Sequence, residues 1–569
     1  MRARGKFVGV GAAVTVAAAL SLSPAARAAD TPANVPGGPL YQKLCSQCHG
    51  EKGDGQGVAA LRLMPRPRDF TAGKFKIRHT PSGSLPTDED LTHVIREGMP
   101  YTSMPAWKQL SDEEIKTLVA AVKSFSPDFA DAAKKPKAIE IPKAPASSAD
   151  SIKKGKEVYA KIGCASCHGE VGRGDGTSAP TLKDDWNHPI RPADLTMRWT
   201  FRGGPTREDI YRTFTTGLNG TPMPSFAESL TDAERWQLVD YIASLDPRDA
   251  PGYSNLLQVQ WSNEELDLAK AKELFATAPP ALFPVIGQVT EPGRAFHPSA
   301  SAVEVRAVYN AREIAFRVTW HDLRADTVGH NAPDLVVPPE EEQAAEAAEA
   351  TAAEAGGDVW GVEEAAATPA AEPAASGGDV WGDEAEAAPG APAAVTPDTE
   401  FSDALAIQLP VTLPTGIRKP YFIFGDSQNP VDLWFIDLAS KAVQRYTGAG
   451  SSSVTVVEGE DVTAIASYDH GEWSVVMKRA LRGSGSVSFE PGQFVPVAFS
   501  VWDGYDRERG SKRGLTQWMY LYTMPQEAPS PIGPMIEAAL AVLVVEIFLV
   551  LWVRRRQRVS QNGEVQAHV

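Results

Sequence analysis

Cysteine is scarce in this chain, which has four cysteines among its 569 residues. All four lie in two short motifs, so none is left for a disulfide or an iron–sulfur cluster. The chain also lacks a Ser-His-Asp arrangement, a glycine-rich phosphate loop and a basic nucleic-acid patch, and its net charge is −17. These absences argue against hydrolysis, nucleotide chemistry and nucleic-acid binding, and they leave the two cysteine motifs as the main chemical signal.

Both motifs have the form Cys-X-X-Cys-His, at residues 45–49 and again at residues 164–168. In this pattern the thiols attach to the vinyl groups of a porphyrin and the histidine coordinates its iron, as in c-type haem. A redox-active cysteine pair or half of a zinc site is the alternative, and either would leave His49 and His168 without a role. We therefore predict two covalent haem c groups, attached at Cys45, Cys48, Cys164 and Cys167.

A methionine is the usual second axial ligand of such a haem in an electron carrier. The distance from Cys45 to Met104 is 59 residues, and so is the distance from Cys164 to Met223; both methionines precede a proline. Leu218 stands in the second unit where the first has a methionine at position 99. Met104 and Met223 are thus predicted to be iron ligands, with a core-filling role as the alternative.

These motifs make residues 37–127 and 151–246 resemble class I c-type cytochromes, which implies small all-α domains folded around their haems. Two capping boxes, Ser111 with Glu114 and Thr231 with Glu234, predict the start of an amphipathic helix in each unit. Residues 128–150 are rich in lysine, proline and alanine, so we predict a semi-rigid linker between the two domains.

Both ends of the chain carry apolar runs. Residues 1–28 have a basic start, an apolar stretch and small residues at their end, which predicts a secretory signal peptide, with an uncleaved anchor as the alternative. Residues 532–553 are long enough to span a membrane, and the arginines that follow predict a cytoplasmic tail at 554–569. The haem domains are then expected in the periplasm, on a single-pass protein of a bacterial inner membrane. Glu546, inside the span, is expected to be protonated, paired or turned to another subunit's helix.

Between residues 255 and 525 the pattern changes to short alternating strands, such as 303–308 and 314–320, which predicts an all-β sandwich. An acidic segment at 340–400, without lysine or arginine, interrupts this domain and is predicted to be disordered. It contains Gly-Gly-Asp-Val-Trp-Gly twice, as a docking motif or as the remnant of a duplication. The predicted fold class is thus multidomain: two all-α cytochrome c domains, one all-β sandwich and one C-terminal transmembrane helix.

Three stretches of the β-domain resemble the haem-binding γ subunits of ethylbenzene dehydrogenase and related molybdenum enzymes of the dimethyl sulfoxide reductase family. They are Trp320–Asp322, Asp403–Pro410 with Gly425 and Val431–Trp434, and Val501–Trp518. The resemblance implies a non-covalent haem b between a methionine and a lysine, and Lys512 lies where the lysine is expected, with a surface lysine as the alternative. Phe424 stands where the family has methionine, so we expect no stably bound haem b and a domain that docks a partner complex.

Together these features predict an electron-transfer protein that is not itself an enzyme. It would be a membrane-anchored periplasmic dihaem cytochrome that carries electrons between a molybdenum oxidoreductase and the respiratory chain. An accessory subunit of a quinol:cytochrome c or terminal oxidase complex is one alternative, and a haem-based binding or sensor protein is another. Histidine–methionine ligation leaves no open position on the iron, which favours electron transfer.

Overall fold

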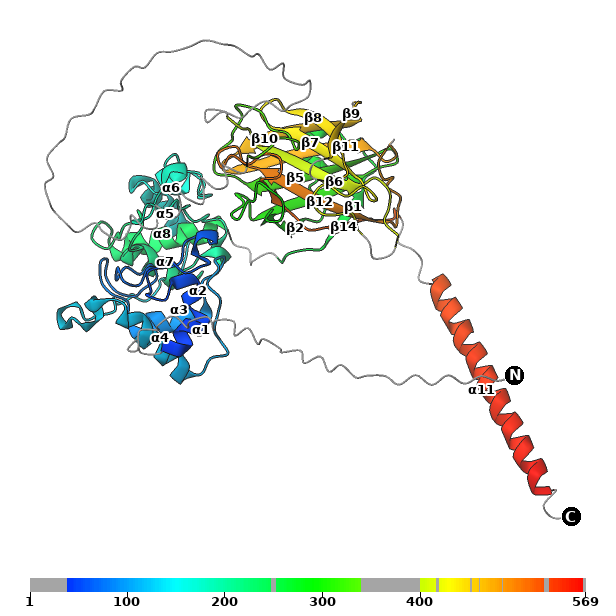
Figure 1. The fold of residues 1–569 in the computed structure, drawn as a ribbon, viewed down its shortest axis with the longest axis horizontal. Helices are drawn as coiled ribbons and strands as arrows, with labels where there is room; N and C mark the ends of the chain where they lie inside the picture. The colour runs from blue at the N-terminus through cyan, green and yellow to red at the C-terminus, as the bar shows by residue number, and fades with distance from the viewer. Residues whose placement is uncertain are drawn as a thin grey trace, which may run out of the picture.

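The computed structural model describes residues 38–246, 252–338, 400–415, 419–450, 453–459, 461–483, 485–526 and 532–565. A helical N-terminal region, a large sheet domain and a long C-terminal helix follow one another along these residues (Figure 1). The predicted signal peptide and nearly all of the predicted disordered segment, up to residue 399, lie outside the described residues.

The first helical unit contains four helices: α1 (Gly38–Leu44), α2 (Ser46–His49), α3 (Asp88–Glu97) and α4 (Asp112–Ser124). The predicted capping box of Ser111 and Glu114 starts α4, and a second box, Thr87 with Asp90, starts α3. The buried face of α4 packs with Tyr41 of α1 into one apolar core. This core brings the first cysteine motif next to α4.

The second helical unit repeats the plan with α5 (Ala149–Lys161), α6 (Ala165–His168), α7 (Arg207–Thr216) and α8 (Asp232–Leu245). Capping boxes again start its last two helices, Thr206 with Asp209 in α7 and Thr231 with Glu234 in α8. Tyr159 of α5 meets Tyr241 of α8 edge to face, with ring centroids 5.3 Å apart. Short 3-10 helices connect the elements in both units.

The two helical units are joined by a buried arginine. Arg78 donates hydrogen bonds to the carbonyl oxygens of Thr216 (2.6 Å) and Gly217 (3.1 Å), both in the second unit. The predicted linker, residues 128–150, also takes part: Ile141 and Ala144 pack against the core of the second unit, and Arg207 donates to the carbonyl of Pro145. The linker therefore lies against the second unit along part of its length and does not act only as a spacer.

The β-domain contains fourteen strands in one sheet. They are β1 (Leu256–Trp261), β2 (Ala281–Pro284), β3 (Ile286–Gly287), β4 (Ala302–Tyr309), β5 (Glu313–His321), β6 (Ala404–Pro410), β7 (Val431–Asp437), β8 (Ala442–Gly448), β9 (Val454–Val457), β10 (Val462–Asp469), β11 (Glu472–Ala480), β12 (Phe494–Trp502), β13 (Gly514–Leu515) and β14 (Met519–Thr523). The main path runs β10-β11-β5-β4-β1-β14-β12-β6-β7-β8-β9. The sheet is mixed, because β1 is parallel to both of its neighbours, β4 and β14.

The sheet turns over at β12 and packs against itself. The first half of β12 pairs with β14 and the second half with β6. Side chains of the two halves meet in a shared core. There the ring centroids of Phe316 in β5 and Trp434 in β7 are 5.7 Å apart. We predicted an all-β sandwich; the structure has one mixed sheet folded over a common core, because β1 enters between β4 and β14 and joins them.

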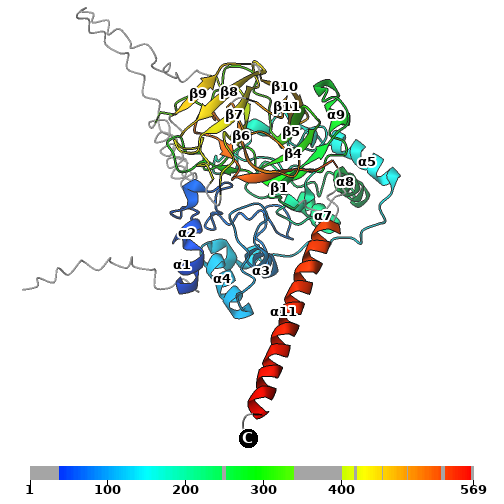
Figure 2. The same ribbon diagram turned by 90° about the vertical axis from the view of Figure 1, so that its right-hand side faces the viewer.

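The C-terminal helix α11 (Ile532–Val565) extends away from the β-domain in both views (Figures 1 and 2). Its segment Ile532–Arg556 has a mean hydropathy of 2.5, and none of its most apolar window is buried. Among the described residues, this helix is the one candidate long and apolar enough to cross a membrane, and it contains the predicted span 532–553.

Replacing Arg78 with methionine should destabilise the helical region. The carbonyls of Thr216 and Gly217 would lose a buried donor, which costs about 1–3 kcal/mol. Denaturant unfolding of the full chain, followed by far-ultraviolet circular dichroism, measures the change. Lys74→Met is the matched control, because Lys74 joins the units through a half-exposed ion pair to Asp185, worth at most about 1 kcal/mol. Equal losses in both variants would contradict the role of Arg78.

Candidate functional site

Each cysteine motif lies where one helix ends and a short second helix begins. In the first unit the hydroxyl of Tyr41 donates to the carbonyl of Gly50 (2.8 Å), and in the second Tyr159 donates to Gly169 (2.6 Å). Both glycines have a φ of 78°, in the left-handed region that favours glycine. The tyrosines thus tie the helix before each motif to the turn that follows its histidine.

The two motif histidines have the same hydrogen-bonding pattern. Nδ1 of His49 lies 2.9 Å from the carbonyl oxygen of Arg68, and Nδ1 of His168 lies 2.9 Å from that of Ala193. A proton on Nδ1 is required for this bond, so Nε2 keeps its lone pair. Burial lowers the pKa of both histidines, which favours the neutral ring that coordinates metal ions.

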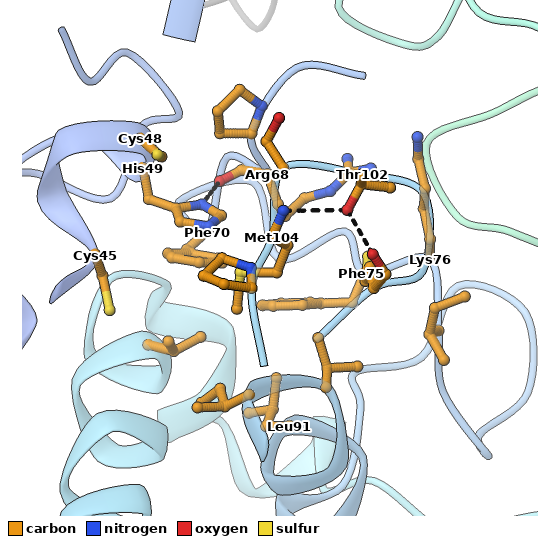
Figure 3. A pocket seen from close by; sticks show the side chains of 18 of the residues that line it. Cys45, Cys48, His49, Arg68, Phe70, Phe75, Lys76, Leu91, Thr102 and Met104 are labelled. Carbon is orange, nitrogen blue, oxygen red and sulfur yellow. Dashed lines mark hydrogen bonds between the residues drawn. The ribbon is translucent and has the colours of Figure 1, made fainter. Parts of the chain in front are cut away.

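A large cavity opens beside the first motif (Figure 3). The empty space enclosed by its lining residues is about 1270 Å³, including open solvent at its mouth. Figure 3 shows Cys45, Cys48, His49 and Met104 around this one space. Most of its walls are apolar, and they include Tyr41, Phe70, Phe75, Leu91, Ile95 and Trp107. Thiols, an imidazole and a thioether around an apolar cavity fit a covalently attached haem.

The methionine loops of the two units share their hydrogen bonds. The amide of Met104 donates to Oγ1 of Thr102 (3.1 Å), as that of Met223 does to Thr221 (3.3 Å). In both loops the methionine carbonyl also accepts a bond from the amide five residues before it, at 3.1 Å. Sequence reasoning missed the two threonines, although each stands two positions before its methionine. Met99 also lines the first cavity, so the choice of Met104 as ligand stays a prediction from the repeat.

In the second unit, Cys164 and Met223 both lie at the edge of its apolar core, together with Phe226. Cys45 has the corresponding place at the core of the first unit. Burial raises the pKa of Cys45 and that of Cys164 to about 11, so both thiols are neutral at pH 7. Cys164 and Met223 are therefore grouped at one core in the second unit, and Cys45 has the place of Cys164 in the first.

In the β-domain the structure places the predicted haem b residues differently from the family pattern. Phe424 is fully buried, and the guanidinium of Arg513 lies 3.7 Å from the centre of its ring. Lys512 donates to the main-chain carbonyl of Asp506 (2.9 Å). Met477, the other sulfur considered, lies within the main core of the folded sheet. Arg513, the neighbour of Lys512, thus lies over the ring of Phe424.

Each of the three γ-like stretches supplies one buried aspartate to a common cluster. Oxygens of Asp322, Asp403 and Asp503 all lie within 4.8 Å of one another, and all three residues are buried. Burial first, and then the charge of neighbouring carboxylates, raises the pKa of Asp403 to about 8 and that of Asp503 to about 7. Such a group can share protons or hold a cation. The sequence indicates the three stretches by their resemblance to the γ subunits, but it does not predict that their aspartates come together.

A family model described as cytochrome c oxidase, cbb3-type, subunit III, matches residues 33–120 and 150–242. A Haloferax mediterranei protein named respiratory nitrate reductase heme subunit ORF7 is 31% identical over 172 residues, which are 29% of this chain and 57% of that protein. The gamma subunit of dimethylsulfide dehydrogenase from Rhodovulum sulfidophilum is 32% identical over 120 residues, 20% of this chain and 45% of that subunit. The chain thus spans about half the length of these curated relatives.

Among solved structures, a chain of the reducing HAO-like protein complex of Kuenenia stuttgartiensis is 44% identical. The match covers 37% of this chain and 96% of that chain, with a TM-score of 0.36. By the family match, the chain carries a cytochrome c domain of the cbb3-type class, and a domain of this class binds haem. Both curated relatives are named as subunits of oxidoreductases, in line with an electron-transfer subunit.

Met104→Ala should remove the sulfur-to-iron charge-transfer band of one haem and lower that haem's reduction potential, because the thioether ligand is lost. Absorption spectra and a redox titration of the purified chain measure both effects. Met99→Ala is the matched control from the same loop and should leave the band in place. Loss of the band in Met99→Ala, with retention in Met104→Ala, would show that the assignment is wrong.

The stability of the β-domain should fall as pH rises from about 4 to about 8. Asp403 and Asp503 keep protons in the folded chain up to about pH 8 and 7, whereas unfolded carboxyls lose them near pH 3.9. The folded state therefore binds more protons in this window, and each retained proton lowers the free energy of unfolding by about 1.4 kcal/mol per pH unit.

Asp403→Asn should flatten this pH dependence, since an amide resembles the protonated carboxyl. Thermal unfolding of the full chain, followed by the fluorescence of its buried tryptophans, gives the slope. Asp469→Asn is the control, because the Asp469 side chain is 84% exposed. An unchanged slope in Asp403→Asn would rule out the cluster as its source.

Proposed function

We propose that this chain is a membrane-anchored dihaem c-type cytochrome that passes electrons between a molybdenum oxidoreductase and the respiratory chain. The observation that carries the proposal is the repeated arrangement of histidine, cysteines and methionine loop in the two helical units. The cytochrome domains are residues 37–127 and 151–246, the β-domain is residues 255–525, and the membrane helix is residues 532–553. The haem domains lie in the periplasm and the tail, residues 554–569, in the cytoplasm.

A covalent haem at each motif supplies a one-electron couple when bound. The chain's own residues hold and tune it. One edge of each haem would be attached by a cysteine pair, Cys45 with Cys48 in the first unit and Cys164 with Cys167 in the second. The main-chain carbonyls of Arg68 and Ala193 orient the two histidines. Apolar walls exclude water from the first cavity. With His49 and Met104, and His168 and Met223, as iron ligands, no position on either iron would be open, and the sites would suit electron transfer and not substrate binding.

We further propose that the β-domain docks the partner enzyme and binds no haem b. The position where the related γ subunits have methionine is filled by Phe424 packed beneath Arg513, and an aromatic ring cannot coordinate iron. The names of the two curated relatives support an oxidoreductase as the partner, one a nitrate reductase and the other a dimethylsulfide dehydrogenase.

The match to a cbb3-type oxidase subunit supports a second candidate function, an accessory cytochrome of a terminal oxidase or quinol:cytochrome c complex. The two candidates differ in the complex to which the chain belongs. Affinity purification from solubilised membranes, with the partner identified by its molybdenum or its haem–copper content, distinguishes them.

A pyridine haemochrome assay on the purified full chain should find two c-type haems and no extractable haem. The thioether bonds keep haem c on the protein during acid–acetone extraction, whereas haem b would enter the solvent. Lys512→Ala should leave the count unchanged, and replacement of Cys45 and Cys48 with serine should lower it to one. One extractable haem per chain, lost in Lys512→Ala, would overturn the proposal for the β-domain.

A further inference from the structure

We propose that Arg68, Lys76 and Arg202 form a carboxylate-binding site, shared between the two helical units, that holds the propionates of the haem attached at Cys45 and Cys48. The inference rests on the proposed function, because it takes a covalent haem as the occupant of the first cavity. Arg68 and Lys76 belong to the first unit and Arg202 to the second.

The three cations line a cavity whose other walls are mostly apolar. Burial first, and then the neighbouring charges of Arg68 and Arg202, lowers the pKa of Lys76 to about 7. Arg68 and Lys76 are half-buried and Arg202 is exposed. Like charges held close together repel one another, and a bound anion offsets this repulsion. Guanidinium groups are well suited to a carboxylate, which they bind through two parallel hydrogen bonds.

Within the described residues, no carboxylate lies at salt-bridge distance from Arg68, Lys76 or Arg202. Three acids lie near Arg68, but each has another partner. Asp184 accepts bonds from the amides of Trp186 and His188, Asp185 pairs with Lys74, and Asp69 accepts from the indole of Trp186.

The direction of the cavity also suits propionates. Figure 3 shows Cys45 and Cys48 at one side of the pocket and Lys76 at the opposite side. In haem c the thioether bonds and the two propionates are on opposite edges of the macrocycle. A haem attached to the cysteines would therefore turn its propionates toward the cations.

The second unit takes part in this site through two residues. Arg202 follows a 3-10 helix, Arg198–Thr200, and lines the cavity of the first unit. Trp186 stacks against Arg68, with the guanidinium carbon 4.5 Å from the ring centre. The propionate edge of the first haem would thus face the second unit, which is where the next haem is attached.

The second haem does not have an equivalent of Arg68. Nδ1 of His49 bonds to the main-chain carbonyl of Arg68, whereas Nδ1 of His168 bonds to that of Ala193. An alanine therefore stands in the second unit where the first has Arg68. The second unit therefore lacks the cation that Arg68 contributes to the first cavity. Positive charge beside a haem disfavours the ferric state, so the first haem should have its potential raised by the three cations.

The test is a redox titration of the full chain with Arg202→Gln and Lys76→Gln, singly and together. The potential of one haem should fall, by about 59 mV for each tenfold change in its redox equilibrium constant. It should also become more dependent on pH, because the propionates lose the cations that keep them ionised. The other haem should not change. Lys74→Gln is the matched control, because Lys74 pairs with Asp185 and does not line the cavity.

Arg202→Lys keeps the positive charge and should restore most of the potential, which separates the loss of charge from a loss of structure. Loss of the first haem alone in Arg202→Gln, restored in Arg202→Lys, would support the site as well. Unchanged potentials and pH dependence in a chain with two c-type haems would overturn it and leave the proposed function intact. A chain without haem at Cys45 would refute the proposed function itself, and the haemochrome assay shows this separately.

Discussion

One hydrogen bond in each helical unit, from the histidine Nδ1 to a main-chain carbonyl, determines the geometry of the cytochrome region. The acceptor lies 19 residues after His49 in the first unit and 25 residues after His168 in the second. This one bond therefore both closes a long loop and fixes the direction in which Nε2 of the histidine points. The glycine turn after each motif and the tyrosine bond to that turn hold the other end of the same loop. Loop shape and ligand orientation thus depend on one contact.

The two helical units are alike in their ligands and unlike in the charges around them. Arg78 of the first unit donates hydrogen bonds to the second unit, and Trp186 of the second unit stacks against Arg68 of the first. Such an interface does not slide easily, because the buried guanidinium of Arg78 needs its own acceptors. On the proposed function, two haems attached to these units would keep a constant separation, which a defined electron path requires.

The features predicted from sequence are those with local signals. The cysteine motifs, the spacing of Met104 and Met223, the capping boxes and the apolar C-terminal helix each depend on residues within one segment. The mixed sheet could not be predicted in the same way, because the parallel pairing of β1 with β4 and β14 joins strands far apart in the chain. The meeting of Asp322, Asp403 and Asp503 and the place of Arg202 depend on topology for the same reason. Periodicity identifies a strand, but it does not identify the strand's neighbours.

The carboxylate cluster and the docking of the second helical unit share their loops. His321 precedes Asp322 and contacts the carbonyl of Arg173, while the hydroxyl of Tyr505, two residues after Asp503, donates to the carbonyl of Pro180 (2.6 Å). Arg191 of the second unit also pairs with Asp506, at 2.8 Å. Contact with the helical unit therefore covers the loops that carry the acids, which helps to keep these acids from water and their pKa values high. The loops that bury the carboxylates of the β-domain thus also contact the cytochrome region. A change in the protonation of the cluster therefore shifts the docking of the helical unit, and docking in turn shifts the protonation.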